Sequence, residues 1–159
     1  MRAIPGYRCC VSGLIRRREL PDRCFHVTAR GVDGAKIFLE DVDRLDFLDV
    51  LGRARARFDL RIVARCLMDT HYHLIIDADT GRLSAAMQLL NSTYALRFNK
   101  RHRRHGHVFG ERFSSWVIRD EAHLSAALQY VVDNPVKAGM CESGADWPWT
   151  RLEVDQLRS

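Results

Sequence analysis

The sequence predicts an α+β protein with a ferredoxin-like, split β-α-β antiparallel sheet and an added C-terminal helix. Segments with the period of a strand and segments with the period of a helix follow in the order β-α-β-β-α-β-α. The 159 residues suffice for one domain with its own core, and the sequence contains no internal repeat or linker. Hydrophobic residues make up 47% and charged residues 28%, as in ordinary globular proteins.

Four segments alternate in hydrophobicity or are rich in β-formers, which is typical of strands. They cover residues 24–30, 60–68, 71–77 and 113–118. Only the turn Asp69-Thr70 separates the second from the third, so these two should form a hairpin.

Three segments carry apolar residues at helical spacing, over residues 39–58, 82–100 and 121–134. The first has acids in its opening turns, where they favour the helix dipole. We expect Pro135 to end the third helix, because the residue before a proline disfavours the α region. The remainder should be irregular, with Trp147-Pro148-Trp149 folding back on the core.

We expect a basic N-terminal arm over residues 1–20, a single domain over residues 21–150 and a tail over residues 151–159. No apolar run approaches the roughly 20 residues that cross a bilayer, and Arg16-Arg17-Arg18 interrupts any signal-peptide pattern. A cytoplasmic, nucleoid-associated protein is therefore predicted. Five irregularly spaced cysteines without a C-x-x-C pair predict reduced thiols.

Positive charge is concentrated in one stretch of the chain. The net charge is +5 and the pI about 9.2, while acids gather between residues 40 and 49. The basic stretch contains Arg97, Lys100, Arg101, Arg103, Arg104, Arg112 and Arg119. This polarity favours a nucleic-acid partner, although a merely solvated face is the alternative.

Two histidines flank one residue at the start of the third strand. Side chains of a strand alternate between faces, so His71 and His73 point the same way and Tyr72 points to the opposite face. Two imidazoles at that spacing can converge on one divalent cation. Taken alone, they could equally be ordinary strand histidines.

Tyr130 and Asn134 lie four residues apart, on one face of the last helix. The phenol could act as a nucleophile and the amide oxygen as a third metal ligand, with the cation as Lewis acid at a phosphate. A covalent phosphotyrosine would store the energy of the broken phosphodiester, consistent with the absence of a phosphate-binding P-loop sequence. Tyr94 is the rival nucleophile, but it lies on the apolar stripe of its helix.

The chain resembles the single-tyrosine HUH transposases, and most of all the REP-associated tyrosine transposases. The resemblance runs from about residue 19 to residue 149 and rests on the order and spacing of its motifs. These motifs cover residues 25–31, 66–68, 71–74, 91–101, 106–109, 112–113, 130–139 and 147–149.

The resemblance implies cleavage of single-stranded DNA on a ferredoxin-like HUH fold. It implies His71 and His73 as metal ligands, Asn134 as the third ligand and Tyr130 as the nucleophile. Mg²⁺ or Mn²⁺ is the implied ion, a 5′-phosphotyrosine the intermediate and a hairpin of a repeated extragenic palindrome the substrate. We expect a monomer, with a homodimer as the alternative, and no membrane or nucleotide cofactor.

The remaining site residues surround this centre. We expect His26 to orient a ligand instead of binding the metal. The predicted DNA contacts are Arg97, Lys100, Arg101, Arg103, Arg104, His107, Phe109, Arg112 and Lys137. The aromatic residues Phe109, Phe113 and Trp116 could stack on bases or fill the core. A domesticated module that binds DNA or RNA hairpins without chemistry is the alternative function.

The chain departs from the family pattern at three points. Asp69-Thr70 stands where Pro-Asn is frequent, which should alter the turn and not the ligands. Glu111 places an acid in the basic loop, and Asp133 adds a carboxylate next to Asn134.

Overall fold

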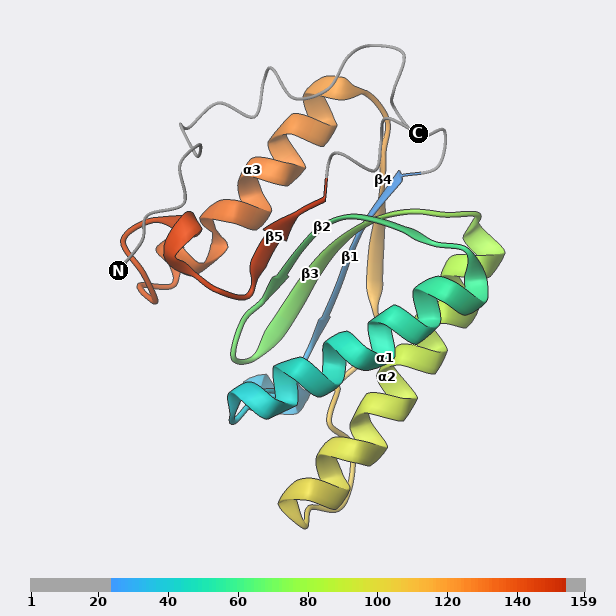
Figure 1. The fold of residues 1–159 in the computed structure, drawn as a ribbon, viewed down its shortest axis with the longest axis vertical. Coiled ribbons are helices and arrows are strands. Elements are labelled where there is room, and N and C mark those ends of the chain that lie inside the picture. The colour runs from blue at the N-terminus through green and yellow to red at the C-terminus, as the bar shows by residue number, and fades with distance from the viewer. Residues whose placement is uncertain (1–23, 154–159) are drawn as a thin grey trace.

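The computed structural model describes residues 24–153, which form a five-stranded antiparallel sheet with helices on both faces (Figure 1). In chain order the elements are β1 (Cys24–Arg30), η2 (Val32–Gly34), α1 (Asp41–Phe58), β2 (Arg61–Leu67), β3 (His71–Asp77), α2 (Thr80–His102), β4 (Ser114–Ile118), α3 (Glu121–Lys137), η3 (Gly144–Asp146) and β5 (Thr150–Leu152). The predicted fold class is confirmed. The expected N-terminal arm and most of the tail lie outside the described residues.

The strand order β4-β1-β3-β2-β5 puts the histidine-bearing strand at the centre of the sheet. The pairing of β1 with β3 places Thr28 opposite His73, and the pairing of β1 with β4 places His26 opposite Trp116. Side chains from three neighbouring strands therefore share one face of the sheet.

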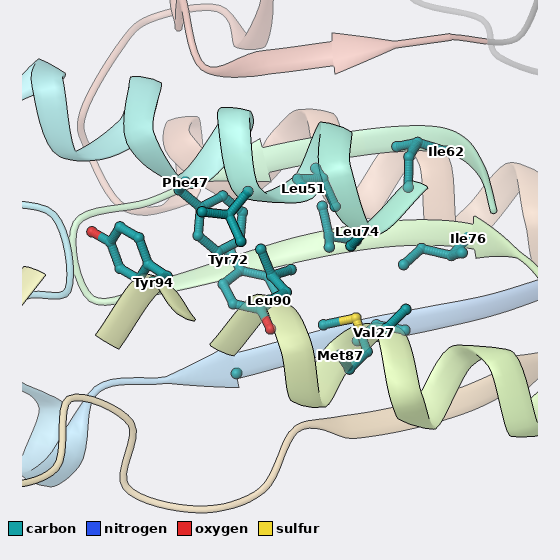
Figure 2. Packing of buried hydrophobic residues seen from close by; sticks show 14 of the residues in the cluster. Val27, Phe47, Leu51, Ile62, Tyr72, Leu74, Ile76, Met87, Leu90 and Tyr94 are labelled. Carbon is teal, nitrogen blue, oxygen red and sulfur yellow. The ribbon is translucent and has the colours of Figure 1, made fainter. Parts of the chain in front are cut away.

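The main core lies on the other face, beneath α1 and α2 (Figure 1). Tyr72 is fully buried there, as its place in the alternation predicts, and its hydroxyl donates to Asn91 Oδ1 at 2.8 Å. Figure 2 shows Tyr72, Leu74 and Ile76 of β3 beside Phe47 of α1 and Leu90 of α2.

A second core lies on the histidine face, beneath α3. It joins apolar residues of α3 to residues of β1, β2, β3, β4 and the turn after β2: Cys24, Val63, Ala64, Cys66, Met68, Ile75, Ile118, Leu124, Ala127, Leu128 and Val131. The helix α3 therefore covers part of the face that carries the histidines. The helix packs on β2, β3 and β5 and comes close to β4.

The last helix is longer than predicted, and the segment after it contains a strand that we did not predict. α3 continues through Pro135 to Lys137, so the expected end at residue 134 is wrong. Pro135 has no N–H to donate to the carbonyl four residues before it, so the helix passes through this position with one backbone hydrogen bond fewer. Gly139, at φ +69°, lies just past the helix end. Beyond it, β5 pairs with β2 where we expected irregular chain.

The β2–β3 turn is anchored by a buried arginine of α1. Arg44 Nη2 lies 2.5 Å from the Asp69 carboxylate. The Arg44 guanidinium is also stacked among Phe38, Trp147 and Trp149, at 5.4–5.6 Å from the ring centroids. Trp147-Pro148-Trp149 thus folds back on the core as predicted, and this contact fixes the turn immediately before His71.

The acidic helix packs against the basic helix, so charges separated along the sequence meet in space. Arg97 Nη1 lies 2.7 Å from Asp46 and 2.9 Å from Asp49. Fully buried Asp43 binds Arg101 at 3.0 Å and His102 at 2.8 Å. The polarised charge that we inferred from the sequence is therefore partly neutralised within the α1–α2 pair.

Asp43 also closes the start of α1. Its Oδ2 accepts the backbone N–H groups of Leu39 and Glu40 at 2.9 and 3.0 Å. Burial alone raises the pKa of this carboxyl. The hydrogen bonds from His102, the two amides and Arg101 outweigh burial and hold the pKa below its ordinary 3.8. Its stabilising effect is therefore present above about pH 4 and lost as the pH falls through the folded-state pKa.

Replacing Asp43 by alanine should lower the free energy of unfolding by about 2–4 kcal/mol, because buried donors lose their acceptor and α1 loses its cap. Urea denaturation at pH 7 measures the loss. Asp49→Ala, which removes an exposed acid of the same helix, should cost clearly less, because solvent screens its ion pairs. Equal losses in both variants would contradict the structural role of Asp43.

Candidate active site

A cavity of about 810 Å³ opens on the histidine face of the sheet. Its walls come from β1, β3, β4, α3 and the loops after β1 and before β4. The predicted residues His26, His71, His73 and Tyr130 all line it. Elements far apart in sequence thus bring most of the predicted centre to one place.

Each histidine of β3 has its Nδ1 atom held by a neighbouring side chain. His71 Nδ1 lies 3.0 Å from Thr70 Oγ1, and His73 Nδ1 lies 3.0 Å from His26 Nε2. When Nδ1 carries the proton in these contacts, the lone pair of each Nε2 is free. A contact of this kind commonly sets the ring orientation and tautomer of metal-binding histidines.

The two Nε2 atoms are in different situations. His71 Nε2 lies 3.4 Å from Asn134 Oδ1, a long contact between two potential ligand atoms. His73 Nε2 is buried without a hydrogen-bond partner in the described part of the chain. An unpartnered buried nitrogen is costly, and a cation would satisfy it.

Tyr130 contacts the rings of this centre from α3. Its ring centroid is 5.3 Å from that of His73 and 5.8 Å from that of His26. The Lys137 ammonium lies 5.1 Å from the same ring, two turns further along the helix. Tyr130 is 44% exposed, whereas Asn134 is almost buried. The phenol is therefore open to a ligand in the cavity.

Burial keeps the three imidazoles neutral. It is the main cause that lowers the pKa of His73 to about 3, assisted by the neighbouring His71, His26 and Arg30. Burial likewise lowers the pKa values of His71 and His26. Only the neutral imidazole can bind a metal, so these shifts favour ligation over protonation near pH 7.

The donor set fits a divalent cation only if the amide takes part. Between residues 24 and 153, no three His, Cys, Asp or Glu side chains gather into a metal-binding group. His71, His73 and the carbonyl oxygen of Asn134 supply a mixed nitrogen and oxygen set. The extra acid Asp133 is instead held by Gln129 Nε2 at 2.7 Å.

The sequence did not reveal one member of this site. We expected Asp69-Thr70 to affect the turn only, but Thr70 contacts His71 directly. A hydroxyl residue adjacent to a candidate ligand was the available sign. Tyr94 is excluded as the nucleophile, because it is fully buried and donates its hydroxyl proton to the Ile37 carbonyl.

The predicted DNA contacts fall into two structural groups. Arg97 and Arg101 are bound to acids of α1, and Phe109 packs against the main core near Tyr72 and Tyr94. The others form no ion pair with a carboxylate of the described residues: Lys100, Arg103, Arg104, His107, Arg112 and Lys137. Contact of either group with DNA stays a prediction.

Comparison with known proteins gives the family of the chain. The family model described as IS200-like transposase matches residues 24–134. The chain belongs to the IS200-like transposase family. None of the helices within residues 24–153 is long and apolar enough to cross a membrane.

Two of the similar proteins are REP-associated tyrosine transposases. A Haemophilus influenzae protein assigned as a REP-associated tyrosine transposase is 26% identical over 134 residues, covering 77% of this chain and 76% of the relative. A solved REP-associated tyrosine transposase bound to a REP hairpin superimposes with a TM-score of 0.67 at 17% identity, over 86% of this chain and 80% of that one. The resemblance predicted from the motifs is confirmed.

A second solved structure shares the fold at greater distance. It is a protein from Deinococcus radiodurans R1 assigned as a transposase, with a TM-score of 0.51 and 15% identity. The match covers 84% of this chain and 97% of that one.

In the metal-free protein, lowering the pH should reduce the free energy of unfolding, and His73 should be one cause. His73 binds a proton near pH 6.5 in the unfolded chain but only near pH 3 in the folded chain, because burial lowers its pKa. Stability is therefore lost as the pH falls below about 6.5. Chemical denaturation in EDTA should show His73→Gln losing about 2 kcal/mol less than the wild type between pH 7 and pH 5. His105→Gln, at an exposed imidazole, is the control, and an unchanged slope in His73→Gln would contradict the burial effect.

Proposed function

We propose that this chain is a metal-dependent endonuclease and strand transferase for single-stranded DNA, with Tyr130 as its nucleophile. The observation that supports this most directly is the convergence of Tyr130, His71, His73 and Asn134 from β3 and α3. A protein that only binds DNA has no evident need for a half-exposed phenol beside two desolvated imidazoles.

The reaction replaces one phosphate ester by another. The phenol of Tyr130 releases its proton to water as its oxygen bonds to phosphorus, and the bond from phosphorus to the 3′ oxygen of the preceding nucleotide breaks. That oxygen takes a proton from water and leaves as a 3′ hydroxyl, and the 5′ phosphate stays on the tyrosine. Attack by a 3′ hydroxyl reverses the step, so rejoining needs no nucleotide cofactor.

His71, His73 and the Asn134 carbonyl oxygen would hold Mg²⁺ or Mn²⁺. The bound ion supplies Lewis-acid polarisation of the phosphate. His26 and Thr70 keep the two Nε2 atoms turned toward that position through their contacts with the Nδ1 atoms. Lys137 places a positive charge beside the phenol, where negative charge approaches with the DNA.

The substrate follows from charge and from the relatives together. The cations without an ion pair continue from the end of α2 into the loop before β4, and a hairpin stem offers phosphates to such a surface. Arg97 and Arg101 can contribute little, since each is already bound to an acid. We therefore assign hairpins of repeated extragenic palindromes as substrate, as in the structural relative that binds a REP hairpin, and a monomer as the acting form.

Tyr130→Phe should abolish the covalent DNA–protein adduct while hairpin affinity stays within about twofold, because a single hydroxyl is lost from a half-exposed ring. A denaturing gel after incubation with labelled single-stranded hairpin DNA and Mn²⁺ reports the adduct. Tyr94→Phe, at the buried tyrosine of α2, should still form it. Adduct formation by Tyr130→Phe would refute the nucleophile, and tight hairpin binding without cleavage by the wild type in either ion would favour the binding-only module.

His71→Ala should lower the Mn²⁺ affinity, measured by calorimetry, by at least about tenfold, because one of three proposed ligands is removed. DNA cutting should fall with it, and EDTA should silence the wild type. His107→Ala, at an exposed loop imidazole outside the cavity lining, should bind Mn²⁺ like the wild type. Full cutting in EDTA would exclude the metal role.

A further inference from the structure

The histidine face of the sheet is left open on the side of β1 and β4. Thr28 and Arg30 of β1 and Ser114 and Trp116 of β4 line the cavity there, beside the candidate catalytic centre. The proposed chemistry uses none of these four side chains. They form an area of the cavity wall next to Tyr130.

Trp116 is an exposed aromatic group within this area. Its side chain is 53% exposed, and its ring centroid is 5.8 Å from that of His26, which in turn is 5.8 Å from that of Tyr130. Phe109 and Phe113, the other aromatic residues of this basic segment, pack against the main core. The structure thus separates one surface aromatic from two core aromatics.

The polar groups around Trp116 suit a nucleotide. Arg30 and Arg112 line the same cavity, and neither forms an ion pair with a carboxylate between residues 24 and 153, so both can meet phosphates. Two carboxylates on the loop side, Asp33 and Glu111, also line it. Carboxylates accept hydrogen bonds from amino groups of bases, which fits a base better than a second phosphate.

We propose that Trp116 forms a binding subsite for one unpaired nucleobase next to the phosphate that Tyr130 attacks. The base stacks on the indole, with the hydroxyls of Ser114 and Thr28 beneath it and the arginines at its flanking phosphates. Stacking on an aromatic ring accepts every base, because every base has a π-face. The position next to the cut rests on the proposed function, whereas the stacking itself does not.

The first test measures binding without chemistry. In a Tyr130→Phe background with EDTA, fluorescence anisotropy compares oligo(dT) of about 12 nucleotides with an abasic strand of the same length. Trp116→Ala should weaken oligo(dT) binding about tenfold and leave the affinity for the abasic strand unchanged. Trp116→Phe, which keeps an aromatic ring, should bind oligo(dT) nearly as well as the wild-type residue. Val117→Ala is the matched control, because Val117 is 50% exposed and neighbours Trp116 on the same strand but faces the other way.

The second test locates the subsite with hairpin DNA carrying one abasic nucleotide at successive positions near the cut. At one position, the abasic nucleotide should slow adduct formation by the wild type. In Trp116→Ala, the abasic and intact hairpins should form the adduct at the same rate. Equal effects in both proteins at every position would overturn the placement.

Failure of the subsite and failure of the proposed function give different results. Equal oligo(dT) affinities for Trp116→Ala and Val117→Ala, with normal adduct formation, would overturn the subsite and leave the enzyme intact. If Trp116→Ala weakens oligo(dT) binding but the wild type never forms an adduct, the subsite stands and the proposed function fails. Dissociation of a dimer by Trp116→Ala in light scattering, without loss of oligo(dT) affinity, would identify the surface as a self-interface and overturn the proposal.

Discussion

The packing of α3 on the second face of the sheet is the contact on which the candidate site depends. Leu124, Leu128 and Val131 fasten the helix to an apolar patch of β2 and β3. Tyr130 and Asn134 lie on the adjoining edge of the same helix, so the apolar contact sets where both are held. The same contact removes water from the imidazoles of β3, which lowers the pKa of His73 to about 3. Position and electrostatics of the site therefore have one physical cause.

A second constraint acts at the start of β3. The Asp69 carboxylate holds Arg44 at 2.5 Å and Lys36 at 2.8 Å, and its backbone carbonyl accepts the N–H of Ile37 at 2.8 Å. Thr70, the next residue, contacts His71. Because one turn serves both the fold and a candidate ligand, a disturbance of the Arg44 contact should reach the site without touching it.

The sequence was sufficient for the elements that repeat a period. β1 and β3 are placed to the residue, β1 by its alternation and β3 by the turn Asp69-Thr70 that precedes its apolar run. β5 spans three residues, too few for a period, and its pairing with β2 depends on contacts made across the fold. The neutralisation of Arg97 by Asp46 was hidden for the same reason, because the two lie 51 residues apart and meet only when α1 packs on α2. Thr70 was missed because its place next to a candidate ligand does not by itself show that the hydroxyl reaches the ring.

The centre combines a protected half and an accessible half. His73 and Asn134 are nearly buried, while Tyr130 and Trp116 each expose about half of their side chains. A nucleophile that was as buried as the ligands could not be reached by a polymer, and ligands as exposed as the nucleophile would be hydrated and easily protonated. The edge of α3 separates the two requirements: Tyr130 lines the cavity, whereas Asn134, one helical turn further along, is buried beside His71. This arrangement leaves the phenol of Tyr130 accessible from the cavity while the imidazoles of β3 stay neutral.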